Sequence, residues 1–201
     1  ENMNDIQSSL QRYDTFPKIL LRNVETMADR PAYRMKHYGI WQTLSWREAA
    51  DMAKEIAHGL AELNVRRGDK ISLVGYNRPD LYISFDAIES LGAVPVPLYA
   101  DSVADEMSYV LDHAEARFVI CQDQEQIDKV LSIKERLPAL EALIYLEPRG
   151  MRGYDQPFIH SLDAVRERGR AHAAVHPDFW LSEIAKGNGE ELSLIAYTSG
   201  T

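Results

Sequence analysis

The sequence contains very little cysteine and no long run of apolar residues. Cys121 is the single cysteine among 201 residues, so no disulfide can form within the chain and a cysteine-cluster metal site is disfavoured. Its position in the apolar stretch 117–121 favours a place in the core over a role as a nucleophile. No stretch approaches the ~18 uninterrupted apolar residues of a membrane-spanning helix, and residues 1–11 lack the basic start and apolar centre of a signal peptide. These absences together predict a cytoplasmic protein.

Basic residues are also scarce. Lys and Arg number 22 against 31 Asp and Glu, which gives a formal net charge of -9, whereas a nucleic-acid surface needs a concentrated basic face. The short cluster of Arg66, Arg67 and Lys70 does not supply one, so we expect no nucleic-acid partner. Gly75 stands alone within the apolar run 71–76, and no Gly-x-Gly-x-x-Gly of a dinucleotide-binding turn follows this run. A nicotinamide-dependent oxidoreductase is therefore a weak alternative.

Residues 1–69 predict a helix, a β-hairpin and a longer helix. Residues 32–36 and 40–44 flank a short connection that contains glycine, which indicates the hairpin. Ser45 and Glu48 have the spacing of a capping box, and apolar residues then recur every three or four positions. The longer helix should therefore bury one face. The hairpin should stand apart from any sheet that follows.

Residues 70–146 change to short apolar runs that alternate with helical patterns, which is typical of βαβ units. We therefore predict an α/β fold with a mostly parallel sheet and helices on both of its faces. Pro95 and Pro97 cannot donate to a ladder, so their run should lie at a sheet edge or a strand end. Ser102 and Asp105 are expected to cap one of the helices. The predicted strands are the apolar runs 71–76, 93–98, 118–121 and 143–146.

Residues 147–191 show weaker patterns and predict a loop-rich connection. Ser161 is expected to open a short charged helix that reaches Arg168. His172 and His176 are four residues apart, but no third ligand is near them in the sequence. We therefore interpret both as solvated side chains and not as a zinc site.

Asn77 and Arg78 follow a predicted strand, where ligands of α/β proteins often bind. Asn77 also precedes Pro79 by two positions, which suits the start of a helix. The cap is the favoured interpretation of Asn77.

A last strand is predicted over residues 192–197, and it leads directly into Thr198, Ser199, Gly200 and Thr201. Taken alone, these small residues fit a surface turn as well as a phosphate loop. In a phosphate loop, backbone N–H groups approach an anion closely, and hydroxyl groups bind phosphate oxygens or Mg²⁺. The neighbouring sequence has to decide between the two.

Several segments resemble one family, the adenylate-forming acyl-CoA synthetases. Residues 194–201, Leu-Ile-Ala-Tyr-Thr-Ser-Gly-Thr, resemble the start of its phosphate-loop signature. Residues 44–69 resemble its first long helix with the closing Gly-Asp, and residues 71–77 the strand and asparagine that follow. Residues 92–99 and 101–119 resemble the Gly-Ala-Val-x-Val-Pro-Leu-Tyr segment and the next helix of bacterial long-chain fatty-acid-CoA ligases. The resemblance covers most of the chain and implies the N-terminal part of an AMP-binding domain.

This resemblance implies a reaction in two steps. A fatty acid carboxylate attacks the α-phosphate of Mg-ATP to give acyl-AMP and pyrophosphate, and the thiol of CoA then displaces AMP. By motif position, Thr198, Ser199, Gly200 and Thr201 would contact the ATP phosphates, with Thr201 near Mg²⁺. No catalytic residue is expected within the 201 residues, since the signature lysine and the acyl pocket belong downstream. We therefore expect this chain alone to be inactive.

Two other interpretations stay open. One is an adenylate-forming enzyme that acts on a different carboxylic acid, because the residues that would line the acyl tunnel are mostly absent. The other is an α/β interaction module without catalysis. Fatty acid, ATP and CoA are the expected partners of the longer enzyme, while peripheral membrane contact and a homodimer or self-association remain open.

Overall fold

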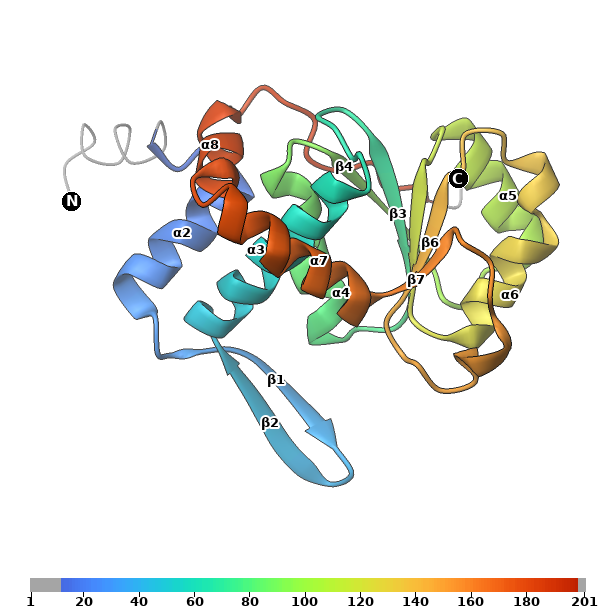
Figure 1. Ribbon diagram of the computed structural model, residues 1–201, viewed down its shortest axis with the longest axis horizontal. Coiled ribbons are helices and arrows are strands. Elements are labelled where there is room, and N and C mark those ends of the chain that lie inside the picture. Colours follow the sequence, from blue (N-terminus) through green and yellow to red (C-terminus); the bar gives the residue numbers. More distant parts are fainter. Residues whose placement is uncertain (1–11, 199–201) are drawn as a thin grey trace.

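Five parallel strands form the central sheet of the computed structural model, which describes residues 12–198 (Figure 1). They lie in the order β4-β3-β5-β6-β7, and each neighbouring pair is parallel. Four of them are the runs predicted from the sequence, and β7 is an additional edge strand. The predicted α/β fold with a mainly parallel sheet is confirmed. The strands are β3 (Lys70–Val74), β4 (Val94–Leu98), β5 (Phe118–Cys121), β6 (Ala142–Tyr145) and β7 (Ile159–Ser161).

Helices cover both faces of this sheet, as predicted (Figure 1). In β5, Phe118 and Ile120 join the core under α3, α4 and α7, while Val119 and Cys121 point into the core under α5 and α6. Cys121 is fully buried, which confirms its place in the core. No helix within residues 12–198 is long and apolar enough to cross a membrane. The helices are α2 (Phe16–Met27), α3 (Trp46–Glu62), α4 (Pro79–Ser90), α5 (Ala104–His113), α6 (Gln124–Ser132), α7 (Leu162–Val175) and α8 (Phe179–Lys186), with 3-10 turns η1 (Lys134–Arg136) and η2 (Met151–Gly153).

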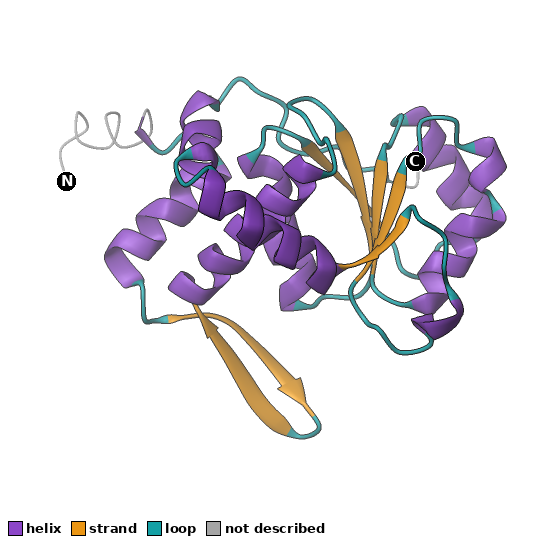
Figure 2. Cartoon of the chain, in the orientation of Figure 1, coloured by secondary structure: helices purple, strands orange, loops and turns teal. Residues whose placement is uncertain are grey.

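The predicted hairpin consists of β1 (Pro31–His37) and β2 (Ile40–Ser45). It forms its own antiparallel two-stranded sheet and projects away from the body of the molecule (Figure 2). The two connecting residues, Tyr38 and Gly39, both have positive φ angles, of 47° and 81°. Positive φ at both central residues is the geometry of the tight turn that matches the twist of paired strands.

The predicted caps of α3 and α5 have opposite outcomes. At α3 the Ser45 hydroxyl accepts from the Glu48 N–H at 3.2 Å and the Glu48 carboxylate accepts from the Ser45 N–H at 2.8 Å, so the capping box is confirmed. The expectation that Ser102 caps α5 is wrong. The helix begins one residue later, and the carboxylate of Glu106 accepts from the N–H of Val103 at 3.2 Å.

The stretch 147–191 holds more regular structure than a loop-rich connection. α7 begins after Ser161 as predicted, but it continues to Val175 instead of ending at Arg168, and α8 and β7 lie in the same stretch. The apolar periodicity of α7 is weak because Gly169 occupies one of its buried positions, where it meets the backbone of α3. A buried glycine gives no hydrophobic signal.

The predicted strand over residues 192–197 does not form. These residues are extended beside the edge strand β4, but the only backbone bond between the two segments runs from the Ile195 N–H to the Pro95 oxygen at 3.2 Å. The Val94 N–H donates to Asp69, toward β3, so the ring nitrogens of Pro95 and Pro97 face the outer edge. Because neither carries a donor, a regular ladder cannot continue there. The prolines thus lie at a sheet edge, as predicted.

Candidate functional site

The carboxyl ends of β3 and β5 mark a position where α/β proteins bind ligands. From β3 the chain turns to β4 on one side, and from β5 it turns to β6 on the other. A crevice opens where two neighbouring connections leave in opposite directions, and ligands collect there.

Gln122 fills this crevice. Its side-chain oxygen accepts from the N–H of Tyr76 at 2.6 Å, which joins the loops after β3 and β5. A Cβ on Gly75 would lie 2.7 Å from the Cβ of Gln122, closer than two side chains can approach. Gly75 is therefore required for close contact between the two strand ends and not for a dinucleotide-binding turn.

A cleft of about 530 Å³ lies beside the crevice, at the carboxyl ends of β3 and β4. Its walls are the loops after these strands, the first turns of α4 and residues 196–198. Of the residues that line it, only Asp101 is charged at neutral pH. The aromatic residues in its walls are Tyr76, Tyr82, Phe85, Tyr99 and Tyr197. The cleft is therefore suited to planar or apolar groups and offers no cation to an anion.

Two hydrogen bonds fix the aromatic walls. The hydroxyl of Tyr76 donates to Asp101 at 3.0 Å, and this bond raises the pKa of Tyr76. The hydroxyl of Tyr82 donates to the side-chain oxygen of Asn77 at 2.8 Å. Asn77 is thus not the helix cap that the sequence favoured, since α4 begins after Arg78 without a side-chain cap. The sequence contained a signal for these cleft residues, because polar and aromatic residues directly follow β3 and β4.

The extended segment 192–198 brings the first predicted phosphate-loop residue to this edge. The hydroxyl of Tyr197 lies 2.7 Å from His113 Nδ1 on α5, and Thr198, which is exposed, lines the cleft. Ser199, Gly200 and Thr201 lie outside the described residues, so only Thr198 is placed. It lies where strand-end ligands of α/β proteins bind.

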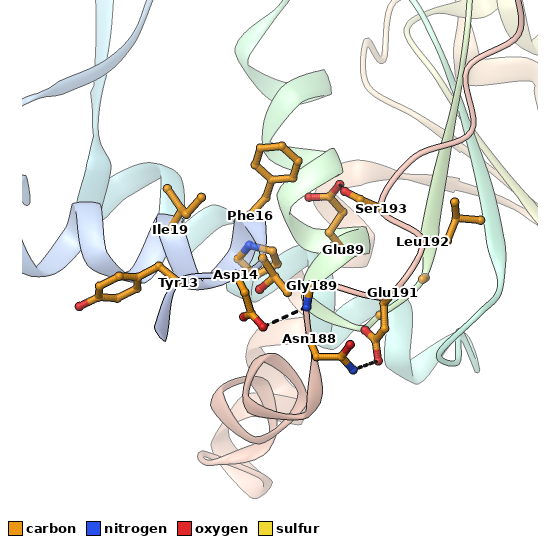
Figure 3. Close-up of a pocket in the computed structure, with 14 residues that line it drawn as sticks. Tyr13, Asp14, Phe16, Ile19, Glu89, Asn188, Gly189, Glu191, Leu192 and Ser193 are labelled. Atoms are coloured by element: carbon orange, nitrogen blue, oxygen red, sulfur yellow. Dashed lines mark hydrogen bonds between the residues drawn. The ribbon is translucent and has the colours of Figure 1, made fainter. Parts of the chain in front are cut away.

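A second, smaller hollow of about 160 Å³ lies at the amino-terminal end of β4 (Figure 3). Its polar groups already have partners. Asp14 accepts from the N–H of Gly189 at 2.9 Å, and the carboxylate of Glu89 accepts from the hydroxyl of Ser193 at 2.7 Å. Burial raises the pKa of Glu89. These bonds fasten the segment that leads to Thr198, so this hollow serves to position the chain.

His172 lies on α7 and His176 follows its last residue. His172 Nδ1 lies 2.7 Å from Nδ1 of the buried His58, and their neighbour is the ring of Phe179. Among residues 12–198, no group of three His, Cys, Asp or Glu side chains is arranged to hold a metal ion. His172 is half-buried and His176 exposed, so the interpretation as solvated side chains is wrong for His172. Burial beside His172 lowers the pKa of His58 to about 4.

Known proteins with similar sequences include acyl-CoA ligases. Long-chain-fatty-acid-CoA ligase FadD15 of Mycobacterium bovis is 26% identical over 189 residues, which are 94% of this chain and 30% of that protein. Long-chain-fatty-acid-CoA ligase ACSBG2 of Homo sapiens is 24% identical over 93% of this chain and 27% of its own length. The chain therefore spans less than a third of these curated relatives.

Solved structures and a family model agree with this similarity. The Mycobacterium tuberculosis fatty acyl CoA synthetase matches 94% of this chain and 33% of its own with a TM-score of 0.71 at 20% identity, which shows the fold. The anthranilate CoA ligase AuaEII, in complex with anthranoyl-AMP, matches 80% of this chain and 29% of its own with a TM-score of 0.68 at 25% identity. The model of the AMP-binding enzyme family matches residues 20–201. Since this match covers most of its length, the chain belongs to the AMP-binding enzyme family.

Proposed function

We propose that this chain is the N-terminal portion of a long-chain fatty-acid-CoA ligase that forms acyl-AMP from a fatty acid and ATP and then transfers the acyl group to CoA. The observation that carries the proposal is the position of Thr198. This residue, the first of the predicted phosphate loop, lies at the carboxyl edge of the parallel sheet and lines the cleft there. Phosphates bound by α/β proteins gather at this edge.

The residues fit Mg-ATP in part. Thr198 offers an exposed hydroxyl, and Ser199, Gly200 and Thr201 would add hydroxyl groups and backbone N–H groups that approach phosphate oxygens. Thr201 is the proposed Mg²⁺ contact, and Mg²⁺ commonly uses few protein ligands besides phosphates and water. Bound Mg²⁺ would offset negative charge as the carboxylate attacks the α-phosphate.

The same site explains why the chain alone should be inactive. A polyphosphate needs preorganised cationic donors, whereas no Lys or Arg is among the residues that line the cleft. The chain also spans 30% of a relative such as FadD15. The missing cation, the acyl pocket and the nucleoside contacts would come from the remainder of a longer polypeptide.

The acid substrate is proposed to be a long-chain fatty acid. FadD15 and ACSBG2, which match over more than nine-tenths of this chain, carry that name. An aryl acid is the competing substrate, because a structure with a similar fold is an anthranilate CoA ligase. The aromatic walls of the cleft fit either an apolar chain or a ring, so the choice rests on the curated relatives.

ATP-pyrophosphate exchange tests the proposal. The chain extended through the rest of its reading frame should exchange label in the presence of a long-chain fatty acid, more than with anthranilate or benzoate. Titration calorimetry of the 201-residue chain with Mg-ATP should show no tight binding. Thr198→Ala in the extended protein should slow exchange, while Thr43→Ala on the distant hairpin should not. If no acid supports exchange by the extended protein, the ligase proposal is overturned. Micromolar ATP binding by the 201-residue chain would overturn its expected inactivity.

A further inference from the structure

In the part of the chain that the structure describes, the outer half of the β1–β2 hairpin, residues 36–43, lies outside the hydrophobic core clusters. All eight residues are exposed, and the ribbon extends away from the helices and the central sheet (Figure 2). Three large side chains surround its turn, and their exposed fractions are 92% for Tyr38, 66% for Ile40 and 64% for Trp41. We call these three residues the hairpin tip. A two-stranded ribbon is marginally stable in water at best without further packing, and within residues 12–198 only the base of this hairpin packs on the core.

The apolar groups of the tip lie on both faces of the ribbon. Trp41 is opposite Lys36 in the antiparallel register, and Ile40 is opposite His37. Side chains alternate between the faces along a strand, so Ile40 and Trp41 point in opposite directions. A protein surface packed against one face would leave the other apolar side chain in water. Insertion of the turn into a membrane interface would cover both side chains.

The hairpin is also a basic segment of an acidic protein. Residues 30–47 contain no Asp or Glu, although the whole chain has a net charge of -9. Arg47 pairs with Asp29 at 3.7 Å, whereas within residues 12–198 neither Arg34 nor Lys36 forms an ion pair, and both are exposed. The cations of the segment are Arg30, Arg34, Lys36 and Arg47. Its charge therefore complements an anionic surface.

We propose that the hairpin tip inserts into the interface of an anionic lipid membrane, where Lys36, level with Trp41 in the register, and Arg34, two residues farther from the turn, meet the headgroups. Trp and Tyr prefer this interface, because one part of each ring system is apolar and another can hydrogen-bond. Lys and Arg near the surface are attracted by anionic lipid. The insertion places the membrane at the far end of the hairpin and does not depend on catalysis by the site at the sheet edge.

Vesicle sedimentation tests this proposal on the 201-residue chain, with a sample without vesicles as the baseline. Vesicles of phosphatidylcholine alone are compared with vesicles that also contain phosphatidylglycerol. The chain should bind the second kind, and added salt should weaken the binding. Arg34→Gln with Lys36→Gln should reduce the partition coefficient by about 25-fold, that is about five-fold for each cation. Ile40→Ser with Trp41→Ser should abolish binding.

Matched variants separate this surface from general stickiness and from misfolding. Leu181→Ser removes an apolar side chain that is 51% exposed on α8, and Arg152→Gln removes an exposed cation elsewhere; both should bind as the parent chain does. Trp41→Phe should keep binding but lose most of the blue shift in tryptophan fluorescence, since Trp180 is buried and Trp46 is half-buried at the base of the hairpin, away from the tip. Circular dichroism checks the fold of each variant. Equal binding to both kinds of vesicle, or full binding by the folded tip variant, would overturn the proposal.

Discussion

Replacement of Gly169 by alanine should destabilise the fold, because α7 crosses α3 at this residue. A Cβ on Gly169 would overlap the carbonyl oxygen of Glu55 and lie 2.9 Å from the backbone nitrogen of Gly59. These atoms belong to the backbone of α3 and cannot rotate away as a side chain could. The two helices would have to separate, which also pulls Arg166 from the Glu55 carboxylate, now 2.8 Å from its Nε.

Two opposing contributions set the size of the effect. Alanine is favoured over glycine inside a helix by about 1 kcal/mol. Overpacking a tight contact costs about 3 kcal/mol at the upper end of the usual range, which applies here because the clash is with backbone. The net loss in the free energy of unfolding should be about 2 kcal/mol, or a fall in Tm of about 4–8 °C for a chain of this length.

Urea unfolding followed by circular dichroism measures this loss. Gly153→Ala is the matched control, since a Cβ there meets no atom within 4 Å, and its free energy of unfolding should stay within about 0.5 kcal/mol of the parent. If Gly169→Ala is as stable as Gly153→Ala, the close helix crossing is not a determinant of this fold. A loss well above about 3 kcal/mol would exceed ordinary overpacking and would refute the expected value of about 2 kcal/mol.

Three further outcomes are expected. Burial lowers the pKa of His58 from 6.5 to about 4, so the free energy of unfolding should fall as the pH drops from 6.5 to 4. His58→Phe should reduce this dependence on pH, as measured by urea unfolding. Burial and the charge of Glu89 raise the pKa of Asp86 from 3.8 to about 7, so ionisation of Asp86 should lower the free energy of unfolding as the pH rises from 3.8 to 7. Asp86→Asn should therefore raise stability above pH 7. Gln122→Ala should cost about 1 kcal/mol through the lost bond to the Tyr76 N–H, measured by urea unfolding. The chain should self-associate at high concentration through the outer edge of β7, which pairs with no further strand within residues 12–198. Sedimentation velocity checks this, and a clean monomer would contradict it.

Local chemistry made most of the fold predictable. The capping pair Ser45 and Glu48, the glycine of the hairpin turn and the four apolar runs each specify an element through neighbours in the sequence. The predictions failed where residues distant in the sequence determine whether an element forms or where it ends. The predicted α7 ended too early because Gly169, which is buried against α3, gives no hydrophobic signal. The strand predicted over residues 192–197 does not form because its neighbour, β4, carries two prolines. Neither fact is visible within the segment that it affects.

The candidate site was predictable only as far as its sequence motif. The order of residues placed Thr198 after an extended segment, and the structure places it at the carboxyl edge of the sheet. Gln122 in the crevice and Asp101 under Tyr76 were missed, because their roles depend on which strand ends are neighbours. Strand order follows from packing over the whole sheet and cannot be read from one βαβ unit.

The position of Thr198 depends on side chains more than on the sheet. Beside β4 the segment 192–198 makes one ladder bond, whereas side-chain contacts hold it at both ends, through Glu89 with Ser193 and through Tyr197 with His113. Each such bond contributes about 1 kcal/mol, so loss of any one removes a large share of what orders the segment. The two prolines that keep the sheet from extending thus leave the segment 192–198, which leads to the predicted phosphate loop, less firmly held than a strand would be. The position of Thr198 should therefore respond to a ligand that binds at the cleft.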